Sequence, residues 1–218
     1  MNKSMYSLML MDKVVNEIDR IAYEKNTNRS NLINQILAEY VSITTPELKA
    51  QEILDSIANR IAGTSSFQVQ NPSSDFMVSI KSAIQYKYRP TIRYAVELYR
   101  TDNREIGEIR ISFRTQNKTL LLKLEEFLKV LIKIERSYFS ALNRSEEIVY
   151  SIEENGLKRT FVLPKSNELD NKEISRAIAD YIKAFDRLIK GYLLNEYITD
   201  KDMERAYQQY IKKTKTII

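Results

Sequence analysis

The sequence predicts an α+β protein in which a short strand-helix-helix module precedes a larger domain with an antiparallel sheet. Apolar residues alternate with polar ones at residues 4–10 and between residues 76 and 114, which is the period of a half-buried strand. Apolar stripes recur at helical spacing in six other stretches, and an Asn-Gly pair at residues 155–156 separates two strand-like runs. The length of 218 residues accommodates one small module and one domain of ordinary size.

The N-terminal module begins with a predicted strand at residues 4–10. A helix of about three turns follows, with an acidic residue in its first turn, where the helix dipole favours negative charge. It ends near Asn26, because asparagine tolerates a left-handed backbone, and Asn28 is a good N-cap for a second helix that extends to Val41. One side of the strand carries Tyr6, Leu8 and Leu10.

A third helix is predicted to start at Thr45-Pro46-Glu47, which supplies a cap, a first-turn proline and a first-turn acid, and to stop at Gly63. Residues 63–75 are polar with turn formers at both ends and are interpreted as a loop or hinge. These signals divide the chain into a module at residues 1–45, a helix and polar linker at 46–75, and an α+β domain at 76–218.

The larger domain is predicted to have the element order β-β-β-α-β-β-α-α. Three antiparallel strands are expected between residues 76 and 114, with turns at Pro90 and at Asp102-Asn103. A long helix at residues 117–143 has a broad apolar stripe and should lie across the sheet. The Asn155-Gly156 pair predicts a hairpin, and the last two helices are expected at residues 171–192 and 199–217.

The composition excludes several kinds of site. The chain has no cysteine and no histidine, so thiolate and imidazole metal ligands and Ser-His or Cys-His nucleophiles cannot occur. A magnesium or calcium site made only of carboxylates stays open, but adjacent acid pairs such as Glu125-Glu126 are interpreted as solvated surface. We therefore expect no enzyme activity, no metal and no cofactor. Because no apolar run approaches about 20 residues, we also expect no membrane contact and a cytoplasmic location.

A lone strand followed by two short helices cannot pair its backbone or bury its apolar sides within one chain. If two copies pair their strands antiparallel, a two-stranded ribbon forms and its apolar side closes onto the helices of both chains. The module therefore predicts a homodimer, and higher oligomers stay open. The outer face of the ribbon would carry Met5, Ser7 and Met9, and such a ribbon fits the major groove of double-stranded DNA.

Residues 4–42 resemble the ribbon-helix-helix family of DNA-binding proteins without a gap. The resemblance includes the alternating strand, the Ile21-Ala22 end of the first helix, the turn at Asn26 and the Asn28-Arg29-Ser30 start of the second helix. It implies that Met5, Ser7 and Met9 face bases, and that Arg29 and Ser30 clasp a phosphate together with the capping residue Asn28. Free backbone N–H groups and the positive end of the helix dipole independently favour an anion there.

The module departs from the family pattern at the outward strand positions, two of which are methionine. Methionine has no hydrogen-bond donor, so base readout would depend on Ser7, on apolar contact with thymine methyl groups, or on Lys3 and Ser4 from the arm. We also expect Lys3 to contact a DNA phosphate. The five basic and five acidic residues between positions 1 and 45 cancel, and the net charge of +5 is spread over the rest of the chain. The alternative is a helical hairpin used only for dimerisation.

The predicted three-stranded region has a basic polar face that is a candidate for a second nucleic acid or an anionic effector. The alternative is a solvated sheet face whose cations pair with Glu97 and Glu108. The basic residues assigned to this face are Lys81, Lys87, Arg89, Arg93, Arg110 and Arg114.

Together these features predict a homodimeric transcriptional regulator that binds double-stranded DNA with full or partial sequence specificity. Its larger domain would bind a small-molecule or protein effector. The alternative is an interaction protein, such as an antitoxin, a DNA-partition factor or a nucleoid-associated protein, whose larger domain contacts another protein. An antitoxin usually has a short, poorly ordered tail, whereas about 140 residues here have the pattern of a folded domain.

Overall fold

The computed structural model describes residues 5–25, 27–86, 89–100, 103–142, 144, 147–165, 169–197, 199–214, 216 and 218, without the side chains of residues 71–73. The chain forms two compact units, Met1–Leu48 and Lys49–Ile218. Within the described residues there are six helices and one six-stranded antiparallel sheet. The α+β class predicted from the sequence is therefore confirmed.

The N-terminal unit contains α1 (Asp12–Glu24) and α2 (Arg29–Tyr40), which pack against each other and confirm the two predicted helices. The Asn28 side chain accepts a hydrogen bond of 2.9 Å from the backbone N–H of Asn31, so it caps α2 as its sequence position predicts. Only three apolar side chains are buried in the described part of this unit, namely Ala22, Leu32 and Ala38.

The strand predicted at residues 4–10 is not confirmed. Residue 4 lies outside the described residues, and residues 5–11 have no regular secondary structure. The physical reason is that the predicted ribbon pairs one copy with another, and a single chain offers this segment no partner backbone. The β-α-α module is thus observed only as two helices preceded by a segment without regular secondary structure.

The second unit is built on a sheet with the strand order β1-β2-β3-β4-β6-β5, in which every neighbouring pair is antiparallel. The three strands predicted between residues 76 and 114 are present as β2, β3 and β4. The predicted hairpin is present as β5 and β6. The strand bounds are β1 (Phe67–Ser74), β2 (Met77–Ala83), β3 (Thr91–Leu98), β4 (Glu105–Arg114), β5 (Tyr150–Glu153) and β6 (Gly156–Val162).

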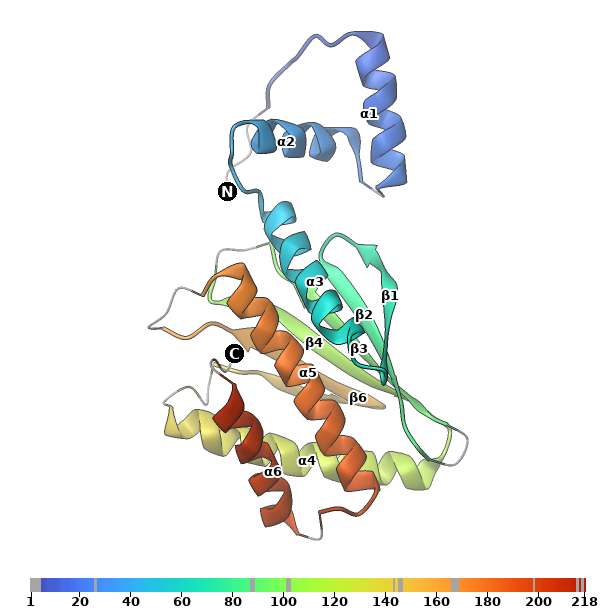
Figure 1. Ribbon diagram of the computed structural model, residues 1–218, viewed down its shortest axis with the longest axis vertical. Coiled ribbons are helices and arrows are strands. Elements are labelled where there is room, and N and C mark those ends of the chain that lie inside the picture. Colours follow the sequence, from blue (N-terminus) through green and yellow to red (C-terminus); the bar gives the residue numbers. More distant parts are fainter. Residues whose placement is uncertain are drawn as a thin grey trace. The chain divides into compact units, whose positions relative to one another are not determined.

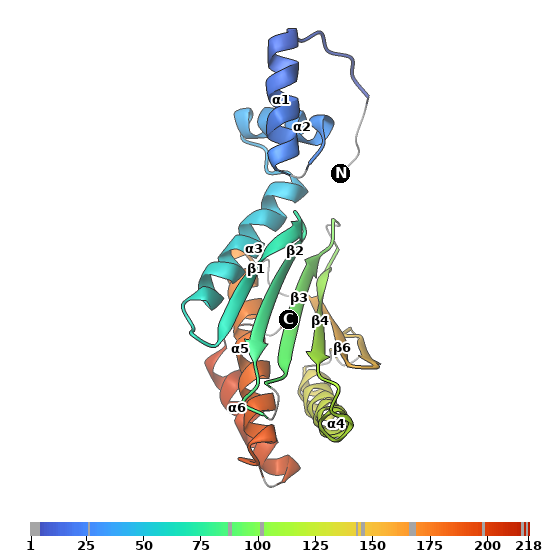
Figure 2. The ribbon, with the colours of Figure 1, turned by 90° about the vertical axis from the view of Figure 1, so that its right-hand side faces the viewer.

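Four helices complete the architecture, and α3 and α5 lie against the same face of the sheet (Figures 1 and 2). α4 packs against α5, α6 and β5. The Thr45 hydroxyl accepts a hydrogen bond of 3.2 Å from the backbone N–H of Leu48, which confirms the predicted cap of α3. None of the helices in the described residues is long and apolar enough to cross a membrane. The helix bounds are α3 (Pro46–Ala62), α4 (Lys118–Ala141), α5 (Asn171–Leu193) and α6 (Asp200–Lys213).

The interpretation of residues 63–75 as a loop or hinge is wrong for most of this stretch, because residues 67–74 form β1. β1 pairs with β2 along Phe67–Ser82, Gln68–Lys81 and Val69–Ile80, and its register shifts after Gln70. It is an edge strand, and an edge strand tolerates proline and polar residues that hide the period-two pattern. Phe67 is buried in the same core as α3, so this stretch belongs to the second unit.

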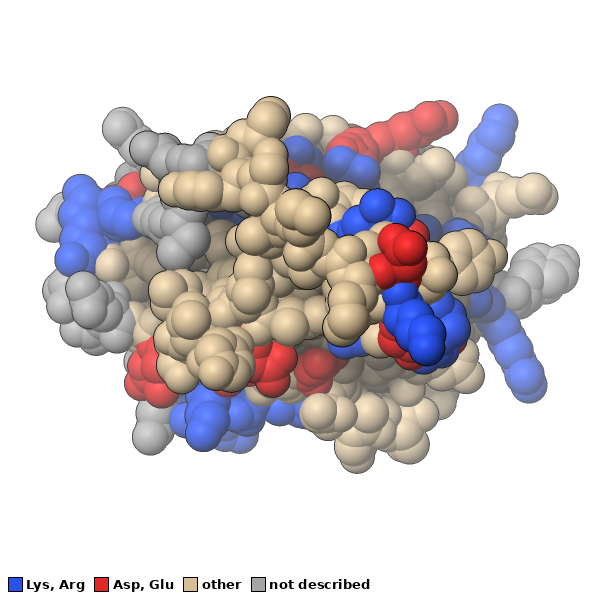
Figure 3. Space-filling model, turned by 90° about the horizontal axis from the view of Figure 1, so that it is seen from above, with Lys and Arg blue, Asp and Glu red and all other residues tan. Residues whose placement is uncertain are grey.

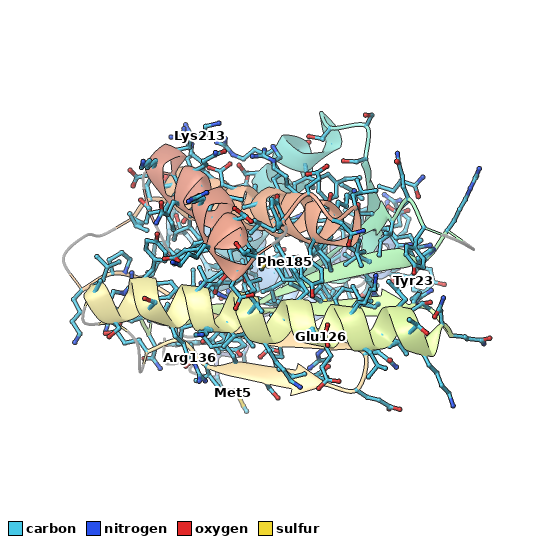
Figure 4. The ribbon with its side chains drawn as sticks, turned by 90° about the horizontal axis from the view of Figure 1, so that it is seen from below. Met5, Tyr23, Glu126, Arg136, Phe185 and Lys213 are labelled. Carbon is cyan, nitrogen blue, oxygen red and sulfur yellow. The ribbon has the colours of Figure 1, made fainter. Side chains whose placement is uncertain are left out.

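The core of the second unit lies between the helices and the inward face of the sheet. Phe185 of α5 is at its centre (Figure 4), with its ring centroid 5.5 Å from that of Phe127 in α4 and 5.9 Å from that of Tyr94 in β3. The core also holds a charged pair. The Nε atom of Arg159 is 3.0 Å from Glu135 Oε2, and both side chains are at most 1% exposed.

The hairpin predicted from the Asn155-Gly156 pair is confirmed. Gly156, however, is not needed there for a positive φ in the turn. The loop residues are Glu154 and Asn155, and no glycine among the described residues has a positive φ. Gly156 instead pairs with Ser112 of β4, where an added Cβ would lie 2.0 Å from the carbonyl oxygen of Ile111. Close approach between two strand backbones therefore requires glycine here.

We expect Gly156→Ala to lower the free energy of unfolding by about 1–3 kcal/mol, because the β4 backbone must move to admit the methyl group. Urea unfolding followed by circular dichroism measures this loss. Gly63→Ala is the matched control, since a Cβ at Gly63 meets nothing within 4 Å and its φ is not positive. Equal stabilities of the two variants would contradict the close approach.

Candidate nucleic-acid interface

The N-terminal unit exposes most of its apolar surface. Of the nineteen large apolar side chains that are exposed in the described residues, thirteen lie between residues 5 and 43. A monomeric soluble protein rarely leaves a contiguous apolar area uncovered, so such a concentration marks an interaction surface. The exposed residues on or next to the two helices are Val14, Tyr23, Ile36, Leu37, Tyr40, Val41 and Ile43.

The segment before α1, residues 5–11, is exposed along its whole length. Met5 and Met9, which were assigned to the outward face together with Ser7, are 98% and 101% exposed. Among the residues assigned to the opposite side, Leu8 is 64% and Leu10 is 42% exposed. Met5, Ser7 and Met9, the three candidate base-facing residues, are thus all exposed. Figure 3 looks from above onto the view of Figure 1, and shows a broad uncharged area with basic and acidic side chains next to one another at its edges.

The start of α2 brings Asn28, Arg29 and Ser30 together, as predicted for the phosphate clasp. All three are exposed. The Asn28 side chain accepts a hydrogen bond from the backbone N–H of Asn31. The backbone N–H groups of the first helical turn have no intrahelical acceptor, so those of Arg29 and Ser30 are available to an anion at this end.

Arg29 itself contacts a carboxylate. Its guanidinium donates two hydrogen bonds to Asp19 of α1, one of them 2.7 Å from Nε to Oδ1, in a bidentate ion pair. The hydrogen bond from Arg29 holds the pKa of the Asp19 carboxyl below its usual range. Both side chains are about half exposed, and an exposed ion pair contributes little. A DNA phosphate can therefore compete with Asp19 for this guanidinium.

A second arginine of the unit is also paired with carboxylates. Arg20 of α1 pairs with Glu17 and Glu24 on its own helix. Lys3, the other residue assigned to phosphate, lies outside the described residues. Sequence reasoning missed both ion pairs, although the spacing of Glu17 and Glu24 from Arg20 on one helix is a signal for pairing.

The second candidate face is the outward side of the larger unit's sheet. Register places Arg93, Arg110 and Arg114 on this side, while Lys87 lies outside the described residues and Arg89 sits in the β2–β3 loop with a φ of 46°. Of these arginines, Arg110 is paired with carboxylates.

Carboxylates share the outward face of the sheet. Arg110 lies 3.6 Å from both Glu108 and Glu153, and Glu108 also pairs with Lys158 at 2.6 Å. Arg93 donates a hydrogen bond of 2.9 Å to the Ser79 hydroxyl. For Glu108, these contacts agree with the alternative interpretation, in which the sheet face is solvated and its cations pair with acidic side chains.

Comparison of the chain with protein-family models, with curated proteins and with solved structures finds no match. Among the described residues, no group of three or more acidic side chains is arranged to hold a metal ion.

Proposed function

We propose that the chain is a homodimeric, DNA-binding transcriptional regulator whose N-terminal unit adopts the ribbon-helix-helix arrangement when two copies associate. One observation supports this most directly: an exposed segment that carries Leu8 and Leu10 precedes two helices that also leave large apolar side chains exposed, namely Val14, Tyr23, Ile36, Leu37 and Tyr40. A second copy would supply both the missing backbone partner and the missing apolar cover. The resulting ribbon has the width that the major groove admits.

In this arrangement each part of the unit has a separate role. The paired segments present Met5, Ser7 and Met9 to base edges, with apolar contact to thymine methyl groups as the main readout available to methionine. The start of α2 in each copy holds a backbone phosphate through free N–H groups and through Arg29, once the phosphate displaces Asp19.

The phosphate clasp is tested by measuring the affinity of the intact chain for its own promoter fragment across salt concentrations. We expect Arg29→Ala, Ser30→Ala to weaken binding about 10–100-fold, because each copy loses charge-assisted hydrogen bonds. The slope of log affinity against log salt should become shallower by about two for a dimer that loses one contact per copy. Asp19→Asn should tighten binding, since it removes the carboxylate that competes for Arg29.

Arg20→Ala is the matched control, because Arg20 is as exposed as Arg29 but pairs within α1. If Arg20→Ala weakened binding as much as the double variant, general charge and not the start of α2 would account for affinity. Equal affinities of the double variant and the unaltered chain would refute the clasp. No binding at low salt by a dimeric chain would favour the interaction-protein alternative, which the zero net charge of residues 1–45 also favours.

A further inference from the structure

The outward face of the larger unit's sheet carries three cations close together at one end. The register places Lys81 of β2 directly opposite Arg93 of β3, and Arg93 opposite Ser112 of β4. Arg114 is two residues beyond Ser112, so it is on the same face and diagonal to Arg93. Cβ atoms are about 5 Å apart between opposite residues and about 7–8 Å apart between diagonal ones. Lys81, Arg93 and Arg114, which we call the cationic cluster, therefore lie within reach of one compact ligand.

The cationic cluster keeps its positive charge. None of its three side chains takes part in an ion pair with another described residue. Elsewhere on the same face the cations are paired, since Glu108 lies 2.6 Å from Lys158 and 3.6 Å from Arg110. The other residues that the register places opposite members of the cluster are uncharged, namely Gln68, Thr91 and Ser112.

Arg93 is held in position by neighbouring polar groups. Its Nε donates a hydrogen bond of 2.9 Å to the Ser79 hydroxyl, which in turn donates one of 3.3 Å to the Gln70 side chain. Ser79 is only 5% exposed, so this support is itself buried. The two terminal nitrogens of the guanidinium have no acceptor among the described residues, which leaves their N–H groups to a ligand. A guanidinium presents such donors in the geometry that phosphate oxygens accept.

The pairing of Lys81 with Arg93 is unfavourable for the chain without a ligand. Like charges directly opposite each other on neighbouring strands are destabilising. Both side chains are half-buried, so water screens their repulsion less than it would at a fully exposed site. A bound anion would remove this repulsion, and a local loss of stability is common at residues that serve binding.

We propose that the cationic cluster binds a di- or triphosphate group, either free or as part of a nucleotide. Arg93 donates to two phosphate oxygens through its terminal N–H groups, and Lys81 and Arg114 neutralise the remaining charge. A single nucleic-acid strand fits less well, because it needs aromatic stacking platforms and Tyr94 of β3 is buried on the inward side. Binding here does not depend on the DNA-binding proposal, because the site belongs to the larger unit alone.

The test is calorimetric titration of the full chain with triphosphate, orthophosphate and adenosine triphosphate, at low salt and without magnesium. We expect triphosphate to bind with a dissociation constant of about 100 μM or tighter, and orthophosphate at least about 10-fold more weakly because it carries fewer charges. Tighter binding of adenosine triphosphate than of triphosphate would identify a nucleotide as the ligand, and equal or weaker binding a free oligophosphate. Absence of triphosphate binding, or equal binding of orthophosphate, would overturn the proposal.

Variants separate the cationic cluster from other basic sites. Lys81→Gln and Arg93→Gln should each weaken triphosphate binding about 10-fold. Lys81→Gln should also raise the urea midpoint of the chain without ligand, because it removes the like charge opposite Arg93. A purely structural role for Lys81 predicts a lower midpoint.

Lys158→Gln is the matched control for these variants. Lys158 is also a half-buried lysine on the outward face, but it is paired with Glu108. Its replacement should leave the affinity for triphosphate within about 2-fold of that of the unaltered chain. A lower urea midpoint of Lys81→Gln, unchanged affinity in both cluster variants, or an equal loss of affinity in Lys158→Gln would each overturn the proposal.

Discussion

Replacing Arg159 with alanine is expected to lower the free energy of unfolding by about 3–5 kcal/mol, because it leaves the carboxylate of Glu135 buried without its cation. The Arg159 guanidinium also lies 4.3 Å from the ring centroid of Tyr181 and donates a hydrogen bond of 2.7 Å to the main-chain oxygen of Ile218. These contacts are lost as well. Urea unfolding at neutral pH, followed by circular dichroism, measures the change.

The contacts that Glu135 keeps in the Arg159→Ala variant explain why the loss of unfolding free energy should be large. Its Oε2 still accepts a hydrogen bond of 2.7 Å from the Tyr150 hydroxyl, but its Oε1 is buried with no hydrogen-bond partner among the described residues. One neutral hydroxyl cannot replace the solvation of a carboxylate. Glu135 is then a charge that the core cannot accommodate.

Two further variants check this explanation of the Arg159 effect. Glu135→Leu, Arg159→Met removes both charges and should be less destabilising than Arg159→Ala, since no unpaired charge stays buried. Tyr150→Phe removes only one hydrogen bond and should cost about 1 kcal/mol. If the double variant were less stable than Arg159→Ala, lost packing and not the unpaired carboxylate would dominate.

Leu8→Asp, Leu10→Asp is expected to make the chain monomeric and to weaken DNA binding more than about 100-fold, under the proposed function. Burial of a leucine side chain is worth about 1.5–3 kcal/mol, and a dimer would bury four of these leucines and would lose all four. The introduced carboxylates would also face one another across the ribbon. Sedimentation velocity measures the oligomeric state, and promoter binding is measured on the same sample.

Met5→Ser, Met9→Ser is the matched control for this dimer test. Both methionines belong to the same segment, but they lie on the side assigned to DNA and are fully exposed. The control should therefore stay dimeric while its base readout changes. If the Leu8→Asp, Leu10→Asp chain remained dimeric, the dimer would not depend on a ribbon formed by these segments. The ribbon part of the proposed function would then be wrong, whatever the affinity of the variant for DNA.

Several elements could be predicted from the sequence because their signals are local. The apolar stripe of residues 117–143 and the cap at Asn28 each depend on neighbours within a few positions, and the structure contains α4 and the capped start of α2 there. β1 was missed because an edge strand with Gln68, Gln70 and Pro72 has little apolar alternation. Its strand character comes from hydrogen bonds to β2.

The candidate DNA site was predicted residue by residue, but its electrostatics were not. Sequence position put Arg29 at the start of α2, whereas its pairing with Asp19 depends on how α1 and α2 cross. The sequence likewise put Lys81, Arg93 and Arg114 on one basic face, but which of them are neighbours depends on the register of β2, β3 and β4.

By itself, the amino-acid sequence determined the helices, five of the six strands of the larger unit's sheet and the absence of thiol and imidazole chemistry. Only the tertiary structure decided that Arg159 and Glu135 are buried and that Lys81 lies opposite Arg93. The physical reason is that periodicity records which side of an element avoids water. A charged residue is exposed by default, and its burial depends on a counter-charge that another element brings.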